Sequence, residues 1–266
     1  CQPLILYASP PDFRSTTVIP DFIGEGTGGV TEALRRRVVM PLAGPMAETD
    51  HVLGHELVHA FQFDITTRPG PGGAGLTGGV NLPLWFVEGM AEYLSLGPVD
   101  AHTAMWLRDA VRQEKLPKIK DLDNPKYFPY RWGQAFWAYV AGRHGDQVVS
   151  QMLRAAGRGG RLESAIQAVL KTTPEELTRQ WHKALHDQYA PVLRATSPPA
   201  QQGRVLVSKD KHGGELNVSP VISPDGKQMV FFSSKGLFSI DLFLADAATG
   251  EIKRKLTDTA VNPHLD

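Results

Sequence analysis

The spacing of hydrophobic residues divides the chain into a long, mainly helical part and a shorter part rich in strands. Alternation typical of strands occurs in QPLILYAS (2–9) and RRRVVMPL (35–42), and the glycine-rich stretch at 12–30 predicts a loop. Pro41 cannot donate a ladder hydrogen bond, so it indicates an edge strand or a strand end. From Ala47 to Asp64 apolar residues recur at helical spacing, which predicts a long helix.

Further helices are predicted as far as about residue 190. Asn81 is an expected cap for a helix at 82–96, which should stop at the Gly-Pro pair that follows. Thr173, followed by a proline, is typical of the start of another helix. Periodicity between these two helices predicts others at about 101–115, 131–144, 146–156 and 162–170.

The hydrophobic period changes to two beyond RATSPPAQQG (194–203), a segment with the composition of a linker. The runs LNVSPVISPDGKQMVFF, SIDLFLAD and EIKRKLTD, joined by Asp-Gly and Thr-Gly turns, predict an antiparallel meander. We therefore expect two domains, 1–193 and 205–266, with a linker at 194–204. The expected fold class is α+β, a mainly helical domain with a small edge-stranded sheet followed by an incomplete antiparallel unit.

The first long helix carries the motif HELVH, which contains His55, Glu56 and His59. Four positions advance about 400° along an α-helix, so the two imidazoles lie one turn apart on nearly the same face and can share an ion. A catalytic zinc takes neutral imidazoles, a third protein ligand and a water whose pKa the metal lowers to about 7. Glu56, beside that ion, would act as the general base and return the proton to the leaving amine.

The next predicted helix supplies two carboxylates one turn apart, Glu88 and Glu92. Glu88 lies within WFVEGMAEY, and a carboxylate in so apolar a segment needs a partner. We predict that Glu88 is the third zinc ligand and that Glu92 fixes the tautomer of a ligating histidine, with the reverse assignment left open. A site of histidines alone, which would add His51, is a second choice because about 80° of drift accumulates around the helix.

Other histidines and tyrosines of the sequence are candidates for the same chemistry. His182 and His186 repeat the spacing of the motif but lack an adjacent glutamate, so we expect a surface pair. A phenol or imidazole that stabilises the oxyanion would come from Tyr127, Tyr130 or His144. Tyr130, just before RWGQAFWAYV, is preferred, with a core tyrosine as the alternative.

The composition limits the classes of partner that the sequence supports. Lysine plus arginine equals aspartate plus glutamate at 28 each, so no global field favours nucleic acid, and a peptide or protein partner fits better. No apolar run approaches the roughly 20 residues of a transmembrane helix, and no signal peptide is recognised. The single cysteine, Cys1, excludes an intrachain disulfide and could be either a lipid-bearing residue or an arbitrary start.

With both motifs in hand, residues 1 to about 190 resemble the gluzincin zinc metallopeptidases, specifically the bacterial peptidase MA-type domain. The matching pieces are LILYASPPDF, VIPDFIGEGTGGVTEALRRRVVMP, HVLGHELVHAFQFDI, LPLWFVEGMAEYLS and YRWGQAFWAYVAGRHG. The resemblance implies that His55, His59 and Glu88 bind one zinc ion and that Glu56 is the base.

The resemblance also implies that the strand before HELVH, here RRVVMP, pairs with the backbone of the substrate. His59 and Glu88 are 29 positions apart, more than in thermolysin-like enzymes, and the glycine-rich stretch 68–80 accounts for the excess. A helix and a strand expected at the start of this family are missing before Cys1.

Residues 218–257 resemble one blade of a TolB-like, WD-type β-propeller, and VNPHLD (261–266) would open the next blade. One blade cannot bury both of its faces, so this similarity predicts a fragment of a longer protein. TolB-like neighbours imply a periplasmic or secreted location.

The expected function is a zinc-dependent peptidase that hydrolyses peptide bonds through a metal-activated water. The alternative is an envelope protein-interaction protein, in which the propeller binds a partner and the zinc domain is structural or inactive.

Overall fold

The computed structural model describes residues 2–20, 22–33, 35, 37–42, 44–68, 76–77, 82–159, 161–198, 201–236 and 239–258. The chain divides into two compact units, Cys1–Leu193 and Arg194–Asp266. It is a mixed α and β protein, and the strands within the described ranges close neither a barrel nor a propeller. Cys1, the cap predicted at Asn81, most of the stretch 68–80 and the segment 261–266 lie outside the described residues.

The described helices are α1 (Pro10–Arg14), α2 (Met46–Thr66), α3 (Leu84–Leu96), α4 (Ala101–Arg112), α5 (Pro129–His144), α6 (Gln147–Gly159), α7 (Leu162–Ala165) and α8 (Pro174–Ala195). A 3-10 turn covers Ile119–Asp121, and a π-helical turn continues α7 over Ile166–Leu170. The helices predicted from periodicity are thus confirmed to within a few residues at most of their ends. None of the helices in the described ranges combines the length and hydropathy needed to cross a bilayer.

The predicted loop at 12–30 is wrong at both ends. The hydroxyl of Ser9 accepts a hydrogen bond from the Asp12 N–H, and prolines occupy the first helical positions, so α1 begins where a strand was expected merely to stop. At the other end of the loop, Val30–Glu32 forms the short strand β2. By contrast, Thr173 caps α8 as predicted, since its hydroxyl accepts from the Glu176 N–H at 3.2 Å.

The first unit contains a three-stranded sheet in the order β1-β3-β2. Strand β1 (Leu4–Tyr7) pairs in parallel with β3 (Arg37–Pro41), and β2 pairs antiparallel with the other side of β3. The prediction that RRVVMP is an edge strand open to substrate is therefore wrong, because both of its sides are taken. Pro41 is instead the last residue of its strand, the alternative that its missing N–H also allowed.

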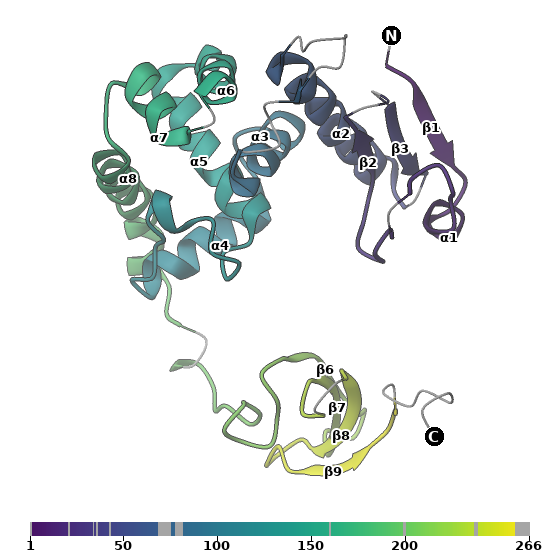
Figure 1. Cartoon of the computed structure of the whole chain (residues 1–266). Helices are drawn as coiled ribbons and strands as arrows, with labels where there is room; N and C mark the ends of the chain where they lie inside the picture. Colours follow the sequence, from purple (N-terminus) through teal and green to yellow (C-terminus); the bar gives the residue numbers. More distant parts are fainter. Residues whose placement is uncertain are drawn as a thin grey trace. The chain divides into compact units, whose positions relative to one another are not determined.

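Helix α2 lies between this sheet and the other helices, with β2 on one side and α3 on the other (Figure 1). Val39 packs with Phe13 and Ile23 on the sheet face away from α2. Val38, its neighbour in the strand, points to the opposite face and is fully buried. A two-stranded ladder, β4 (Thr67–Arg68) with β5 (Leu76–Thr77), follows α2.

Aromatic rings form much of the core of the helical region. Phe136 of α5 meets Trp85 of α3 edge to face, with ring centroids 5.0 Å apart, and it also meets Trp181 of α8. The indole N–H of Trp137 donates to the Phe86 carbonyl at 2.9 Å, so its polar atom is satisfied within the core. These contacts join α3, α5 and α8 into one packed layer.

Helices α3 and α5 approach so closely that their backbones touch at Gly89 and Gly133. A Cβ atom built on Gly89 would overlap the backbone of Gly133, and one built on Gly133 would overlap the Trp85 carbonyl. Only glycine fits at either position, because the neighbouring atoms belong to the main chain and cannot rotate away.

The second unit is an antiparallel meander of β6 (Asn217–Ile222), β7 (Gln228–Ser233), β8 (Asp241–Asp246) and β9 (Ile252–Lys255), paired in that order as predicted. Alternate residues of β7 and β8 form a small core on one face: Met229, Phe231, Phe243 and Ala245. Val221, Ile222 and Phe232, by contrast, are exposed.

The helix crossing can be tested by adding one methyl group. Gly133→Ala should lower the free energy of unfolding by about 1–3 kcal/mol, because the helices must separate to admit the Cβ. Chemical denaturation followed by circular dichroism measures the change. Gly142→Ala in the same helix is the matched control, since nothing lies within 4 Å of its Cβ, and it should be neutral or slightly stabilising. Equal effects of the two variants would contradict the close contact.

Candidate metal centre

Helices α2 and α3 bring His55, His59 and Glu88 together at their shared face. The Nε2 atom of His55 lies 3.0 Å from that of His59 and 3.0 Å from Glu88 Oε2. The third side of this triangle, from His59 Nε2 to Glu88 Oε2, is 3.3 Å. One atom from each predicted ligand thus converges on a single point.

The size of this triangle fits a zinc ion. When ligand atoms lie at about 2.0–2.1 Å from zinc in a tetrahedron, the atoms themselves are about 3.3 Å apart. The three measured separations, 3.0, 3.0 and 3.3 Å, are close to the edges of one tetrahedral face. Three protein ligands leave the fourth corner open, as a catalytic site requires.

Hydrogen bonds on the far side of each ring decide where the protons are. The Gln62 amide N–H donates to the Val87 carbonyl at 2.9 Å, so its oxygen must face His59 Nδ1, 2.8 Å away. The Glu92 carboxylate likewise accepts from His55 Nδ1 at 3.0 Å. Both neutral imidazoles therefore carry their proton on Nδ1 and a lone pair on Nε2.

With both imidazoles neutral, two lone pairs and a carboxylate oxygen would face one another at hydrogen-bond distance with no proton between them. Such an arrangement is repulsive unless a positive charge lies among the three atoms. Burial alone would lower the pKa of His55, but hydrogen bonds to Glu88 and Glu92 outweigh it and raise the pKa to about 9. Glu88 responds in the opposite sense, since its bonds to both histidines outweigh burial and hold its pKa at about 2. With that pKa, His55 carries a proton on Nε2 at neutral pH, and this proton supplies the positive charge among the three atoms. Two imidazoles and a carboxylate are also a donor set that suits zinc in place of the proton.

Glu92 organises the layer behind the ligands. It is buried, and its Oε1 accepts from His55 and also from His51 Nε2 at 2.9 Å. Arg131 of α5 donates to Glu92 Oε2 at 3.0 Å and to Asp100 at 3.2 Å. Burial would raise the pKa of Glu92, but the bonds to both histidines outweigh it and lower the pKa to about 2.

The geometry favours Glu88 over Glu92 as the ligand. His51, His55 and Glu92 form a second group with donor atoms close enough for a metal. The guanidinium of Arg131 already supplies positive charge 3.0 Å from Glu92, which disfavours a cation there. In that second group His55 would have to bind the metal through Nδ1, the atom that donates a hydrogen bond to Glu92. We therefore assign His51 as a second hydrogen-bond donor to Glu92 and not as a metal ligand.

Glu56 lies on the side of the centre that faces the sheet. Its side chain is buried, and its Oε2 accepts a hydrogen bond of 2.6 Å from the Thr31 hydroxyl of β2. Its negative charge also contributes to the raised pKa of His55, the residue that precedes it in α2. The predicted base is thus held beside the predicted ligands by a residue of the edge strand.

Tyr130 lies on the opposite side, where its ring stacks on His55 with centroids 5.8 Å apart. Burial raises the pKa of Tyr130 to about 12, helped by the charges of Glu88 and Glu56, so the phenol keeps its proton at neutral pH. The other candidates lie elsewhere. Tyr127 packs on Trp132, and His144 ends α5, about 21 Å along the helix axis from Tyr130.

The histidine pair of α8 takes no part in this centre. The ring of His182 hydrogen-bonds the Pro117 carbonyl at 2.9 Å, and neither His182 nor His186 belongs to a metal-ligand group among the described residues. The spacing that they share with His55 and His59 is therefore insufficient without a carboxylate from a second helix.

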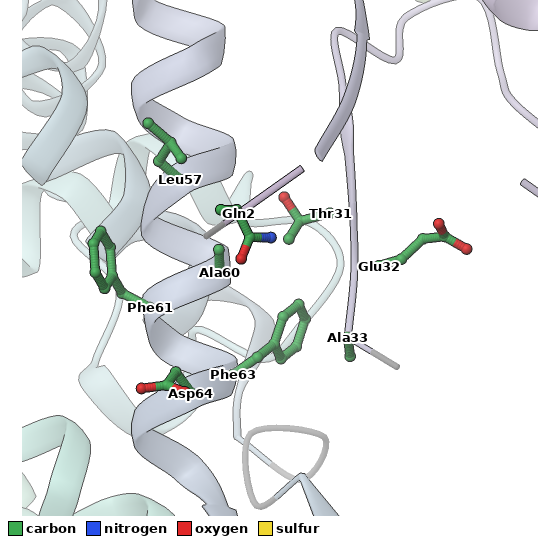
Figure 2. Close-up of a pocket in the computed structure, with 9 residues that line it drawn as sticks. All are labelled: Gln2, Thr31, Glu32, Ala33, Leu57, Ala60, Phe61, Phe63 and Asp64. Atoms are coloured by element: carbon green, nitrogen blue, oxygen red, sulfur yellow. The ribbon is translucent and has the colours of Figure 1, made fainter. Parts of the chain in front are cut away.

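A cavity of about 360 Å³ lies next to Glu56, between α2 and the end of β2 (Figure 2). Thr31 lines the cavity and also bonds Glu56, so the two features adjoin. The other lining residues are Gln2, Glu32, Ala33, Leu57, Ala60, Phe61, Phe63 and Asp64.

Three residues of the centre were not predicted from the sequence: Thr31, Gln62 and Arg131. Gln62 had a local signal, because it lies three positions after His59 and therefore on the same helical face. Thr31 and Arg131 had none, since each reaches the site through contacts between segments distant in the sequence.

The ligand assignment predicts metal binding with one zinc per chain. His55→Ala should abolish it, and Glu92→Gln should keep the stoichiometry but weaken affinity by about 10- to 100-fold, because the His55 tautomer is held less firmly. Competition with a chromophoric chelator measures both effects. His182→Ala is the matched control and should bind zinc like the parent; equal loss in both histidine variants would disprove the site.

No protein-family model matches this chain, and a comparison with curated proteins gives no match. Membership of the gluzincin family therefore stays a prediction.

Proposed function

We propose that the first unit is a zinc-dependent peptidase of the gluzincin type that acts on peptides or proteins. The observation that carries the proposal is the convergence of His55, His59 and Glu88 on one point, between a buried carboxylate and a protonated phenol. Zinc held there would supply a Lewis acid that polarises a carbonyl group and makes a water more acidic.

Different residues of the chain transfer the proton and stabilise the negative charge on the substrate. The Glu56 carboxylate takes a proton from the attacking water and hands it to the leaving amine nitrogen. Thr31 keeps that carboxylate oriented through its 2.6 Å hydrogen bond. The Tyr130 hydroxyl donates to the substrate carbonyl oxygen as that oxygen gains negative charge.

The substrate backbone would pair with β2. Among the described strands, β2 pairs only with β3, so its other side is available for an added strand. Thr31 in β2 bonds the base, which puts this edge beside the reacting groups. Strand β2 thus takes the role that the resemblance implies for RRVVMP.

We further infer that the second unit is a propeller-type blade, in keeping with a periplasmic or secreted protein. Its four-stranded meander with one small core supports this inference. The exposed Val221, Ile222 and Phe232 favour the alternative function, in which this unit binds an envelope partner and the zinc domain is structural.

Replacement of Glu56 distinguishes a peptidase from an interaction protein. Glu56→Gln should retain one zinc per chain but lower kcat by about 10²–10⁴-fold, because the amide cannot accept the proton. Cleavage of a peptide library followed by mass spectrometry, with metal analysis, measures both properties. Glu48→Gln, an exposed change in the same helix, should cleave normally. Full activity in Glu56→Gln would refute the base, and no cleavage by the zinc-loaded parent would favour the interaction protein.

Removal of one hydroxyl tests the oxyanion role. Tyr130→Phe should keep zinc and KM but lower kcat by about 10²–10³-fold, because one donor to the developing oxyanion is lost. Steady-state kinetics on the best peptide measures the effect, with Tyr127→Phe as the control outside the centre. A fall in thermal stability with unchanged kcat would instead indicate a tyrosine that serves only packing.

A further inference from the structure

Two large aromatic side chains beside the metal centre are left partly in solvent. Trp106 of α4 is 38% exposed, and Phe128, just before α5, is 44% exposed. Their ring centroids lie 5.7 Å apart, and the Phe128 ring lies 5.1 Å from that of Tyr130. Since Tyr130 stacks on His55, these three rings form a continuous surface from the metal centre outward, here named the aromatic wall.

Trp106 differs from every other tryptophan in the chain. The remaining four are at most 5% exposed and belong to the helical core: Trp85, Trp132, Trp137 and Trp181. A tryptophan with much of its surface in water gains less from folding than a buried one, so its apolar area is available to a ligand. Phe128 has the same property.

We propose that the aromatic wall is a subsite for one aromatic or large aliphatic side chain of the peptide, within about three residues of the cleaved bond. This inference rests on the proposed function. The centroid separations from His55 through Tyr130 to Phe128 add to about 11 Å, and an extended peptide advances about 3.3 Å per residue. A substrate side chain at that distance from the reacting carbonyl therefore meets the wall.

The aromatic wall is continuous with the metal centre, so the group that occupies it belongs to the substrate. Tyr130 belongs both to the wall and to the centre, so a peptide seated at the ligands must pass along the wall or along the opposite flank. The opposite flank is the cavity between α2 and β2 (Figure 2). That cavity is lined mainly by apolar side chains, and its Glu32 is paired with Arg37, so it is the rival subsite that a control variant has to test.

The test compares peptides that carry Phe, Leu, Ala or Gly at each of three positions on either side of the cleaved bond. The parent should prefer Phe or Leu at one position. Trp106→Ala and Phe128→Ala should each lower kcat/KM for those peptides about tenfold, mainly through KM, and leave the Gly peptide unchanged.

Phe61→Ala is the matched control, because Phe61 is an exposed aromatic residue that lines the rival cavity. It should leave the preference intact. Loss of the preference in Phe61→Ala but not in the two wall variants would assign the subsite to the cavity and overturn the proposal. Absence of any apolar preference in an active parent would overturn it as well.

Fluorescence gives a readout that needs no turnover. Acrylamide should quench Trp106 selectively, since the other tryptophans are buried, and Trp106→Phe should remove this component. The preferred Phe peptide, added to the zinc-loaded Glu56→Gln protein, should protect Trp106, whereas its Gly counterpart should not. Protection without cleavage by the parent would refute the peptidase and retain the wall; cleavage without protection would refute the wall alone.

Discussion

The backbone contact between Gly89 and Gly133 fixes how far α3 lies from α5, and the centre depends on that distance. Helix α3 presents Glu88 to the two histidines, and α5 presents Tyr130 to His55. Arg131, next to Tyr130, donates to Glu92 across the same crossing. Because protein interiors are close-packed, a shift at the glycines would move all of these groups together.

The centre is also a balance between charge burial and hydrogen bonding. Burying Glu88 and Glu92 costs free energy, which the bonds from His51, His55 and His59 offset. His55 donates its Nδ1 proton to Glu92, and His59 donates its Nδ1 proton to Gln62. Glu88 then faces the two Nε2 atoms, where a proton on His55 balances its charge, and the proposed zinc ion would have to displace that proton.

Local spacing determined what could be predicted from the sequence. His55, Glu56 and His59 are set by one helical turn, and Glu88 is marked by its apolar neighbours, so these positions needed no tertiary knowledge. The mistaken edge assignment for RRVVMP has a nonlocal cause. Whether a strand is central or at an edge depends on its partners, and β1 and β2 come from segments whose pairing the pattern of one strand does not encode. Thr31 and Arg131 could not be predicted for the same reason, because each reaches the centre from a segment distant in the sequence.

Helix α2 carries the two proposed histidine ligands and the proposed base, whereas the surfaces proposed for a peptide belong to its neighbours. Strand β2 lies on the Glu56 side, and the aromatic wall lies on the Tyr130 side. Rings and backbone that touch a substrate can therefore change without altering the spacing of the groups on one rigid helix. Because catalytic geometry tolerates displacements of only about an ångström, in the proposed peptidase this separation would let the flanks set which peptides bind while α2 maintains the chemistry.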